Sequence, residues 1–496
     1  MNREREEAAD GGELRQDLKA DGSETDASGV SRRDFLQRGA MLGGAAAVAG
    51  GAAGWAMGGA SHAEAGEGAA PRNVDGRPPN ILFILTDQHR LDGVGAYGMT
   101  EVMTPNLDKL AEEGVRFDRF YTAQPVCAPN RATILTGLYP HSHGLLENTW
   151  DLTPRVTSMA EMLLPHGYAT GYFGKWHLGR DEAQGFETFP YYPNDGRGDR
   201  QYFTIDGETR YGTDVITEDV IEFIEEKQDE PFYAYVSYYP PHPPYSVPEE
   251  YEEMYRDIYP DDADRRIYYA MCTKVDENIG ELLDTLDRLN LRDNTLVVFT
   301  TEHGHYFTDD RRWNDHAKRT CHDTAARVPL IMRMPGVIPS GQTTEELICS
   351  VDLVQTLMPL LGFEPIRGLQ GQDLSGLAKG ESAGRDALVM ENYPFITRDA
   401  PGPWRNAPEW FHEERPIHEE RGVMARGGWK LILGASRPPE LYQVHEDPEE
   451  VNNLWEEMKD SDVARQLCQE LLDWAILTGD NTAPHLLRPL GIFSAE

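Results

Sequence analysis

The segment PVCAPNRATILTG, residues 125–137, places a cysteine, a proline and an arginine at close spacing before a short apolar stretch. If Pro129 lies in the first turn of a helix, Cys127 stands at or just before the helix start, where free backbone N–H groups favour negative charge. Arg131, four residues on, then lies on the same face as Cys127. A guanidinium fixed beside an oxyanion site suits a sulfate or phosphate ester. A buried thiol beside an arginine that pairs with a surface carboxylate explains the segment equally well.

Two apolar stretches lead into side chains that can bind a metal ion. NILFILTD ends in Asp87 and is followed by Gln88, and TLVVFTT is followed by Glu302 and His303. Asp87 and Glu302 offer carboxylate oxygens to a hard divalent cation, whereas Gln88 offers an amide oxygen. His303 adds a ring nitrogen. Either stretch alone could simply cap a helix, but ligands collect at the carboxyl ends of strands in open α/β sheets, so the shared position indicates one metal site.

Three other segments place cationic side chains after strand-like stretches. GKWHLG carries Lys175 and His177 two residues apart, hence on the same side of an extended chain. YPPHPPY holds His242 in a proline-flanked loop, and the loop before VPLIMRMP carries Lys318. Each residue alone is typical of a solvated lysine or of a histidine bonded to the backbone. Together they predict a basic pocket in an acidic protein, which indicates an anionic ligand.

Alternating strands and helices must position these groups. Short apolar runs predict buried strands, and amphipathic stretches with capping signals, such as Ser158 with Glu161, predict the helices between them. This alternation over roughly 300 residues predicts an α/β fold, a large doubly wound domain with a mainly parallel central sheet. The predicted strands are 80–87, 168–174, 232–239, 295–301 and 328–335, and the predicted helices are 104–114, 158–167, 215–226 and about 264–290.

The pattern changes after about residue 385. ALVMEN, RGVMARGG, WKLILG and ELYQV are short strand-like pieces separated by turn residues, and a final helix is expected over about 462–477. They predict a smaller C-terminal α+β subdomain with a short antiparallel sheet. We therefore expect the large domain at 80–384 and the subdomain at 385–496.

The first 63 residues predict an export signal rather than part of the fold. SRRDFLQ carries paired arginines, and a glycine-rich, weakly apolar run and a small-residue site near 61–63 follow it. This order resembles a twin-arginine (Tat) signal, and the run is too polar for a membrane anchor. Residues 64–79 are expected to be a linker. We expect export by the twin-arginine machinery to the periplasm, the cell surface or the medium, with no stable membrane span after cleavage.

The composition excludes some partners. Acidic residues outnumber basic ones 84 to 46, for a formal net charge of −38. Such a surface repels nucleic acid and anionic lipid, so neither is expected as a partner. The excess resembles the acidic coat of halophilic proteins, which is a hypothesis about habitat. The five cysteines are an odd number for an exported chain, and Cys127 is the candidate to stay unpaired, since the spacing of the other four specifies no bridge.

The ordered motifs resemble those of the sulfatase family in the alkaline-phosphatase superfamily. The family signature Cys-x-Pro-x-Arg stands here as Cys127, Pro129 and Arg131. GKWHLG, the His-Pro of YPPHPPY, VVFTTEHGH, the K…RVPLIMRMPG segment and the closing ELYQVHEDPEEVNNLW match as well, so the resemblance extends from about Asn80 to about Trp455.

This resemblance implies a modified nucleophile and a metal. Cys127 would be converted to formylglycine (3-oxoalanine), whose hydrate supplies a hydroxyl for attack on sulfur. Many members of the family have a second Asp at Gln88 and an Asp at Glu302, and the loss of one charge at Gln88 leaves calcium favoured and manganese as the alternative. The metal ligands implied are Asp87, Gln88, Cys127 after modification, Glu302 and His303.

The resemblance also implies roles for the cations. Arg131 and Lys175 would orient the hydrate and offset its charge. His177 would take the proton from the remaining hydroxyl, so that the covalent sulfate is expelled. His242 and Lys318 would bind the sulfate of the ester and assist the leaving alcohol.

The function expected from this resemblance is an exported sulfuric ester hydrolase. Its partners would be a sulfated small molecule or carbohydrate, a formylglycine-generating enzyme and the Tat machinery. One alternative is a phosphate or phosphonate monoester hydrolase on the same scaffold. A second is a non-catalytic relative that binds sulfated glycans, with Gln88 and Glu302 marking a decayed metal site. Carbohydrate, choline and aryl sulfates all remain open, because specificity lies in loops such as 190–212 and 395–420.

Overall fold

The computed structural model describes residues 77–148, 150–179, 183–190, 192, 201–205, 207–307, 318–393, 419–435 and 437–491. The predicted export signal, most of the linker and most of loop 395–420 lie outside these residues. Residues 68–496 form one compact unit. Within the described ranges, no helix is both long and apolar enough to cross a membrane.

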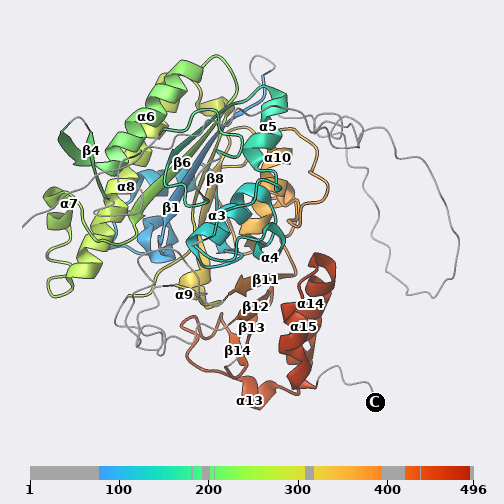
Figure 1. Cartoon of the computed structure of the whole chain (residues 1–496). Helices are drawn as coiled ribbons and strands as arrows, with labels where there is room; N and C mark the ends of the chain where they lie inside the picture. Colours follow the sequence, from blue (N-terminus) through green and yellow to red (C-terminus); the bar gives the residue numbers. More distant parts are fainter. Residues whose placement is uncertain are drawn as a thin grey trace, which may run out of the picture. The chain divides into compact units, whose positions relative to one another are not determined.

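A central eight-stranded sheet carries the site (Figure 1). Its order is β10–β2–β8–β7–β1–β6–β3, and β9 pairs with β2. Among the described strands, β8 runs antiparallel to β2 and β7, and the other pairs are parallel, which confirms the mainly parallel sheet. The strands are β1 Asn80–Asp87, β2 Val115–Tyr121, β3 Ala169–Gly174, β6 Phe232–Pro241, β7 Thr295–Thr301, β8 Arg327–Arg333, β9 Gln342–Thr344 and β10 Ile348–Cys349.

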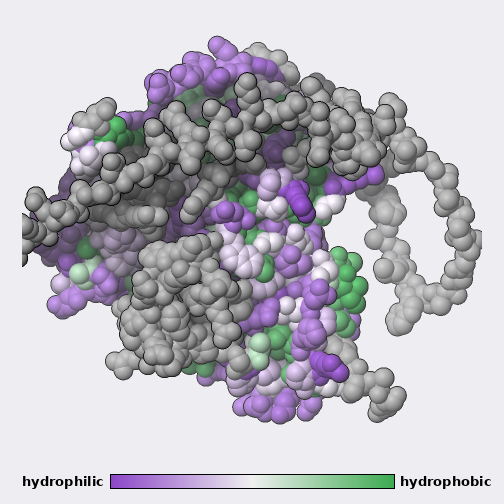
Figure 2. Space-filling view, in the orientation of Figure 1, coloured by the Kyte–Doolittle hydropathy of each residue, from purple (hydrophilic) through white to green (hydrophobic). Residues whose placement is uncertain are grey.

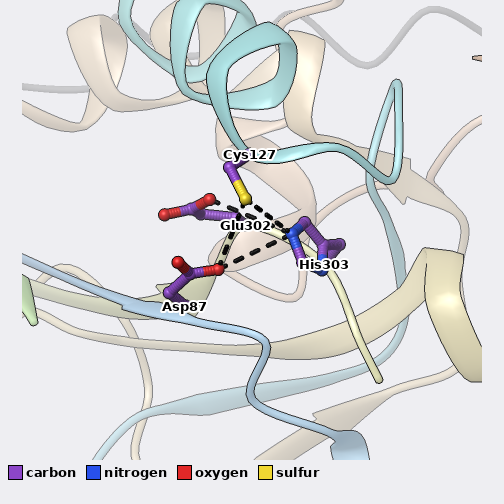
Figure 3. Close-up of side chains that lie close together, drawn as sticks. All are labelled: Asp87, Cys127, Glu302 and His303. Atoms are coloured by element: carbon purple, nitrogen blue, oxygen red, sulfur yellow. Dashed lines mark hydrogen bonds and ion pairs between the residues drawn. The ribbon is translucent and has the colours of Figure 1, made fainter. Parts of the chain in front are cut away.

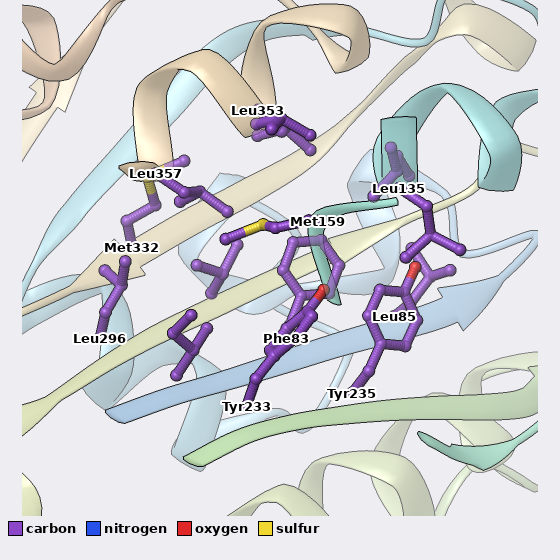
Figure 4. Packing of buried hydrophobic residues seen from close by; sticks show 14 of the residues in the cluster. Phe83, Leu85, Leu135, Met159, Tyr233, Tyr235, Leu296, Met332, Leu353 and Leu357 are labelled. Carbon is purple, nitrogen blue, oxygen red and sulfur yellow. The ribbon is translucent and has the colours of Figure 1, made fainter. Parts of the chain in front are cut away.

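Helices cover both faces of this sheet, because successive side chains of a strand point to opposite faces. Phe83 and Leu85 of β1 pack into one core, and Leu82 and Ile84 pack into the other. Figure 4 shows Phe83 and Leu85 among the side chains of the first core. The first core is covered by α3 Cys127–Thr136, α5 Met159–Leu163 and α10 Leu353–Leu360, and the second by α2 Pro105–Glu112, α6 Gly212–Lys227 and α8 Ala263–Arg288. The doubly wound architecture is confirmed.

The helix starts use local and distant caps. Ser158 and Glu161 form the predicted capping box at α5. Thr104 is the N-cap residue of α2, but its side chain makes no capping hydrogen bond there. Instead Asp276 of α8 accepts the backbone N–H of Leu107, at 2.7 Å. A carboxylate from a neighbouring helix therefore satisfies the free N–H groups of α2.

The C-terminal part forms the predicted antiparallel sheet. Its order is β11 Ala387–Asn392, β12 Glu420–Ala425, β13 Trp429–Gly434 and β14 Glu440–Gln443. Helix α14, Asp462–Thr478, packs on it through a shared apolar core. The backbone N–H of Glu391 in β11 donates to the carbonyl of Ala123 at 2.7 Å. The small sheet is thus joined directly to the segment that precedes Cys127.

The surface agrees with the composition. On the face drawn in Figure 2, hydrophilic residues predominate around α6, and an apolar patch covers the end of α14. Ile476 and Leu477, near that end, are 71% and 85% exposed. All five cysteines lie within the described ranges and are buried and unpaired, so these residues need no disulfide.

Candidate active site and family

The site begins where β1 and β7 end side by side. Thr86 of β1 pairs with Thr301 of β7 in parallel register, so the next residues of both strands leave the sheet at one edge. Asp87 and Glu302 are both fully buried there. The predicted meeting of the two strand ends is therefore present.

Four side chains direct one ligand atom each to a common centre (Figure 3). These atoms lie within 4.8 Å of one another, and all four side chains are buried. Cys127 Sγ lies 3.6 Å from Asp87 Oδ1 and 3.3 Å from His303 Nε2. Carboxylate oxygens, a ring nitrogen and residue 127 together suit a divalent cation. The cluster consists of Asp87, Cys127, Glu302 and His303.

Gln88 lies beside this centre and is oriented by His305, a residue without a predicted role. Burial lowers the pKa of His305 to about 3, so its ring is neutral. The Gln88 Nε2 donates to His305 Nδ1 at 2.8 Å, and His305 Nε2 donates to the hydroxyl of Tyr245 at 2.6 Å. The Gln88 Oε1 is thereby left to accept from Lys318 Nζ, at 3.3 Å. The alternation of His303 and His305 after β7 was the available signal.

Helix α3 begins at Cys127, as the segment predicted, and every residue of the helix is buried. Arg131 is fully buried and forms an ion pair with Glu302. The carboxylate partner of Arg131 is therefore part of the site and is not at the surface. The Arg131 Nη1 also donates to Tyr172 OH at 2.8 Å, Ser237 Oγ at 2.7 Å and the Lys175 carbonyl at 2.5 Å. Neither Tyr172 nor Ser237 was predicted.

Two lysines surround residue 127 with positive charge. Lys175 Nζ pairs with Asp87 Oδ2 and lies 3.7 Å from Glu302 Oε1. Lys318 Nζ donates to Cys127 Sγ at 2.7 Å. Burial and Asp87 both act to raise the pKa of the Cys127 thiol, but Lys175 and Lys318 hold that pKa well below its usual value. Position 127 therefore favours a negative charge.

The two carboxylates differ in their protonation. Burial would raise the pKa of Asp87, but Lys175, followed by His242, holds it well below its usual value. Burial raises the pKa of Glu302 to about 7, although Arg131 opposes this shift. Asp87 therefore keeps its negative charge to a lower pH than Glu302 does.

The two remaining histidines lie close to the same centre. His242 Nε2 is 4.0 Å from Asp87 Oδ2, and its Nδ1 lies 2.5 Å from the Pro243 carbonyl. His177 is partly exposed as a residue, but its Nδ1 is buried, and its φ is 58°. The extended chain that we expected from Lys175 to His177 is therefore wrong, because β3 ends before it and the backbone turns. Burial, followed by Lys175, lowers the pKa of His177, which leaves its ring neutral.

Comparison with known proteins decides the family. Residues 79–363 match the family model described as Sulfatase, and residues 310–476 match the one described as N-sulphoglucosamine sulphohydrolase, C-terminal. An ulvan-active sulfatase from Formosa agariphila is 36% identical over 417 residues, which cover 76% of this chain and 77% of that protein. The chain belongs to the sulfatase family. As a sulfatase it is an enzyme of sulfate ester hydrolysis.

More distant sulfatases and their structural relatives agree. An N-acetylglucosamine-6-O-sulfatase from Bacteroides thetaiotaomicron is 26% identical over 510 residues, covering 81% of this chain and 87% of that protein. The structure of the phosphonate monoester hydrolase of Agrobacterium radiobacter matches with a TM-score of 0.67 and 24% identity, over 81% of this chain and 96% of that one. The second likeness shows that this sulfatase shares the fold of a phosphonate hydrolase.

Proposed function

We propose that this sulfatase is exported and hydrolyses sulfate esters of carbohydrates, with a formylglycine made from Cys127 as nucleophile and a divalent cation. The observation that carries the proposal is the position of Cys127. It opens a helix at the centre of a buried cluster with Asp87 and His303, and Lys318 donates to it. A carbohydrate substrate is favoured because the relatives reported above are named for ulvan and for N-acetylglucosamine.

The donor set fits a divalent cation. Both carboxylate oxygens of Glu302 are buried and accept no hydrogen bond from any described residue, although Oε1 forms ion pairs with Arg131 and Lys175. Asp87, Glu302, His303 and residue 127 would hold the ion, with the Gln88 oxygen beside them. When bound, it would supply the charge that lowers the proton affinity of a hydroxyl at residue 127. Oxygen donors favour calcium, with manganese as the alternative.

The cations and histidines of the chain divide the remaining work. Arg131 fixes Glu302, and Lys175 offsets the charge of Asp87, so both hold the surroundings of residue 127 electrically balanced. His177 is neutral, so its ring is free to accept a proton, although burial and Lys175 lower its pKa. His242 and Lys318 stand beside the same centre and would bind the sulfate group of the ester.

Export adds two partners. A twin-arginine signal in the first 63 residues would send folded cargo through the Tat machinery. A formylglycine-generating enzyme would then have to act in the cytoplasm, before translocation. The acidic surface fits a salt-rich habitat outside the cell.

Mass spectrometry of the peptide that spans residue 127 tests the nucleophile. We expect the mass of the aldehyde in active protein and that of the thiol in protein from a host without the modifying enzyme, which should be inactive. Full activity of the thiol form would overturn the formylglycine mechanism. Rates on matched aryl sulfate and aryl phosphate esters test the substrate class, and a large preference for phosphate would favour the phosphate or phosphonate hydrolase.

A further inference from the structure

The small C-terminal sheet holds the five residues that follow Lys318, here called segment 319–323. Each of its four strands contributes one side chain to this contact. The contributing residues are Asn392 of β11, Glu420 of β12, Lys430 of β13 and Glu440 of β14.

The first two strands hold the backbone of the segment. Asn392 Nδ2 donates to the carbonyl of Arg319 at 2.7 Å, and the N–H of Cys321 donates to Glu420 Oε2 at 3.3 Å. Gly422 of β12 packs against Cys321 so closely that a Cβ at Gly422 would lie 2.7 Å from the Cys321 Cβ. The backbone of β12 therefore leaves the segment no room to shift towards the sheet.

Lys430 is the central contact. Its side chain is fully buried, and its Nζ forms ion pairs with Asp323 and, at 2.7 Å, with Glu450 Oε1. The same Nζ donates to the carbonyl of Cys321 at 3.2 Å. A buried ammonium is unfavourable unless it is paired and hydrogen-bonded, and here Asp323 and the Cys321 carbonyl accept its hydrogen bonds while Glu450 supplies a second ion pair. Because these contacts can all form only in one arrangement of the side chain, Lys430 fixes the positions of Cys321 and Asp323.

Glu450 belongs to the closing motif ELYQVHEDPEEVNNLW. It has a φ of 53°, a conformation that few residues other than glycine adopt. Asp447 accepts the N–H of Asn452 at 2.8 Å and so closes the turn around Glu450. The Glu450 Oε2 accepts the N–H of Asp323 at 2.6 Å. The motif thus delivers a second anion to Lys430 and a direct hydrogen bond to the segment.

Lys318 stands at the start of this held segment, and its Nζ reaches the site. On the opposite side, Arg319 is bound by both carboxylate oxygens of Glu147, each at 2.6 Å, and its N–H donates to the carbonyl of Pro125 at 3.2 Å. The segment is therefore clamped between the small sheet and the approach to Cys127.

We propose that Lys430 is a positioning residue that acts through Lys318. Its buried ammonium fixes segment 319–323, so the small sheet determines where the Lys318 ammonium stands against residue 127 and the sulfate group of the substrate. The proposal rests on the proposed function for the role of Lys318 in sulfate binding, and it gives the closing motif of the chain a physical role.

A double-mutant cycle tests this link. We expect Lys430→Met to lower kcat/KM for a sulfate ester by about 10- to 100-fold in the otherwise wild-type chain. In the Lys318→Ala background the same substitution should add less than about 3-fold, because the lysine through which Lys430 acts is already gone. Equal losses in the two backgrounds would overturn the proposal, since a purely structural defect does not depend on Lys318.

Asp480→Asn is the matched control. Asp480 pairs with Arg421 at 2.8 Å in the same subdomain, and both side chains are buried, but neither forms a described hydrogen bond or ion pair with segment 319–323. We expect Asp480→Asn to lower the melting temperature and to leave kcat/KM of the folded protein unchanged. A loss of kcat/KM equal to that of Lys430→Met would mean that general destabilisation explains both.

Hydrogen exchange separates this inference from the proposed function. Backbone amides of segment 319–323 should exchange faster in Lys430→Met than in wild type, and their exchange rates should be unchanged in Asp480→Asn. Both results are expected whether or not the protein hydrolyses an ester. If wild-type protein cleaves no sulfate ester, the proposed function fails while the exchange result still reports on the clamp. Unaltered exchange in Lys430→Met would overturn the inference even in a fully active enzyme.

Gly422→Ala is the second variant should Lys430→Met not fold. It leaves every charge in place and pushes Cys321 away by its new Cβ. We expect the same pattern, a loss of kcat/KM that nearly disappears in the Lys318→Ala background. A loss that persists in full in that background would count against the proposal.

Discussion

Arg131 and Glu302 form a buried ion pair one turn into α3, with side-chain exposures of 1% and 0%. The pair joins the helix that carries Cys127 to the end of β7. The Glu302 carboxylate contacts the guanidinium of Arg131 and also belongs to the cluster of possible metal ligands. One side chain thus serves both the arginine and the predicted metal site.

Glu302→Gln should weaken both the fold and the metal site. Removing one partner of a buried ion pair leaves the other charge uncompensated, which costs about 3–5 kcal/mol. We expect a loss of that order in the free energy of unfolding in denaturant, together with a lower metal content by elemental analysis. Glu302→Asp, which keeps the charge, should retain the metal. A full metal content in Glu302→Gln would show that Glu302 is not a ligand.

Lys175→Met should reduce turnover strongly. Lys175 is the main group that lowers the pKa of Asp87. Without its positive charge, the effect of burial is opposed less and the pKa of Asp87 rises. We expect kcat/KM to fall by at least about 100-fold, and the loss to be smaller at high pH, where Asp87 regains its charge. A pH–rate profile of the variant measures this. A profile that is lower at every pH by the same factor would contradict the proposed cause.

His143 should make the protein less stable in mild acid. Burial lowers the pKa of His143 to about 3. Below about pH 6.5 the His143 ring is therefore protonated in the unfolded chain but stays neutral in the folded protein. Stability is therefore lost as the pH falls from about 6.5 towards 3, by up to ~1.4 kcal/mol per pH unit. The free energy of unfolding, measured in denaturant, should fall between pH 7 and pH 5, and this fall should be smaller by ~2 kcal/mol in His143→Gln. An identical difference in both proteins would contradict this.

Removal of the metal should lower the melting temperature. A ligand present at 100 times its dissociation constant stabilises the folded state by ~2.7 kcal/mol, so a chelator should remove about that much. We expect calcium to restore the melting temperature, and manganese to do so if it is the native ion. Thermal unfolding of chelated and reloaded protein measures this effect independently of turnover. No change on chelation would mean that the cluster binds no ion.

Much of the scaffold could be predicted because its signals are local. Short apolar runs identified β1, β3, β6, β7 and β8, and the capping box at Ser158 identified the start of α5. Strand β2 was missed, because Arg116, Asp118 and Arg119 interrupt its apolar residues. It is recognisable only from its partners β8, β9 and β10, which lie far along the chain.

The supporting residues of the site escaped prediction for a related reason. Tyr172 and Ser237 are ordinary residue types in ordinary strands, and they bind Arg131, which only folding brings close to them. The left-handed backbone conformation at His177 could not be predicted, because the residue is neither a glycine nor an asparagine. The sequence could therefore indicate the candidate catalytic and metal-binding side chains, but not the residues that position them.

The clamp on segment 319–323 is built from strands and a turn that the ribosome makes long after Cys127. Between the synthesis of Cys127 and that of Glu450, the nascent polypeptide lacks part of this clamp. At usual elongation rates this interval lasts on the order of tens of seconds. During that time the Cys127 thiol would be open to the proposed modifying enzyme, and this access would end once the last strands join the small sheet.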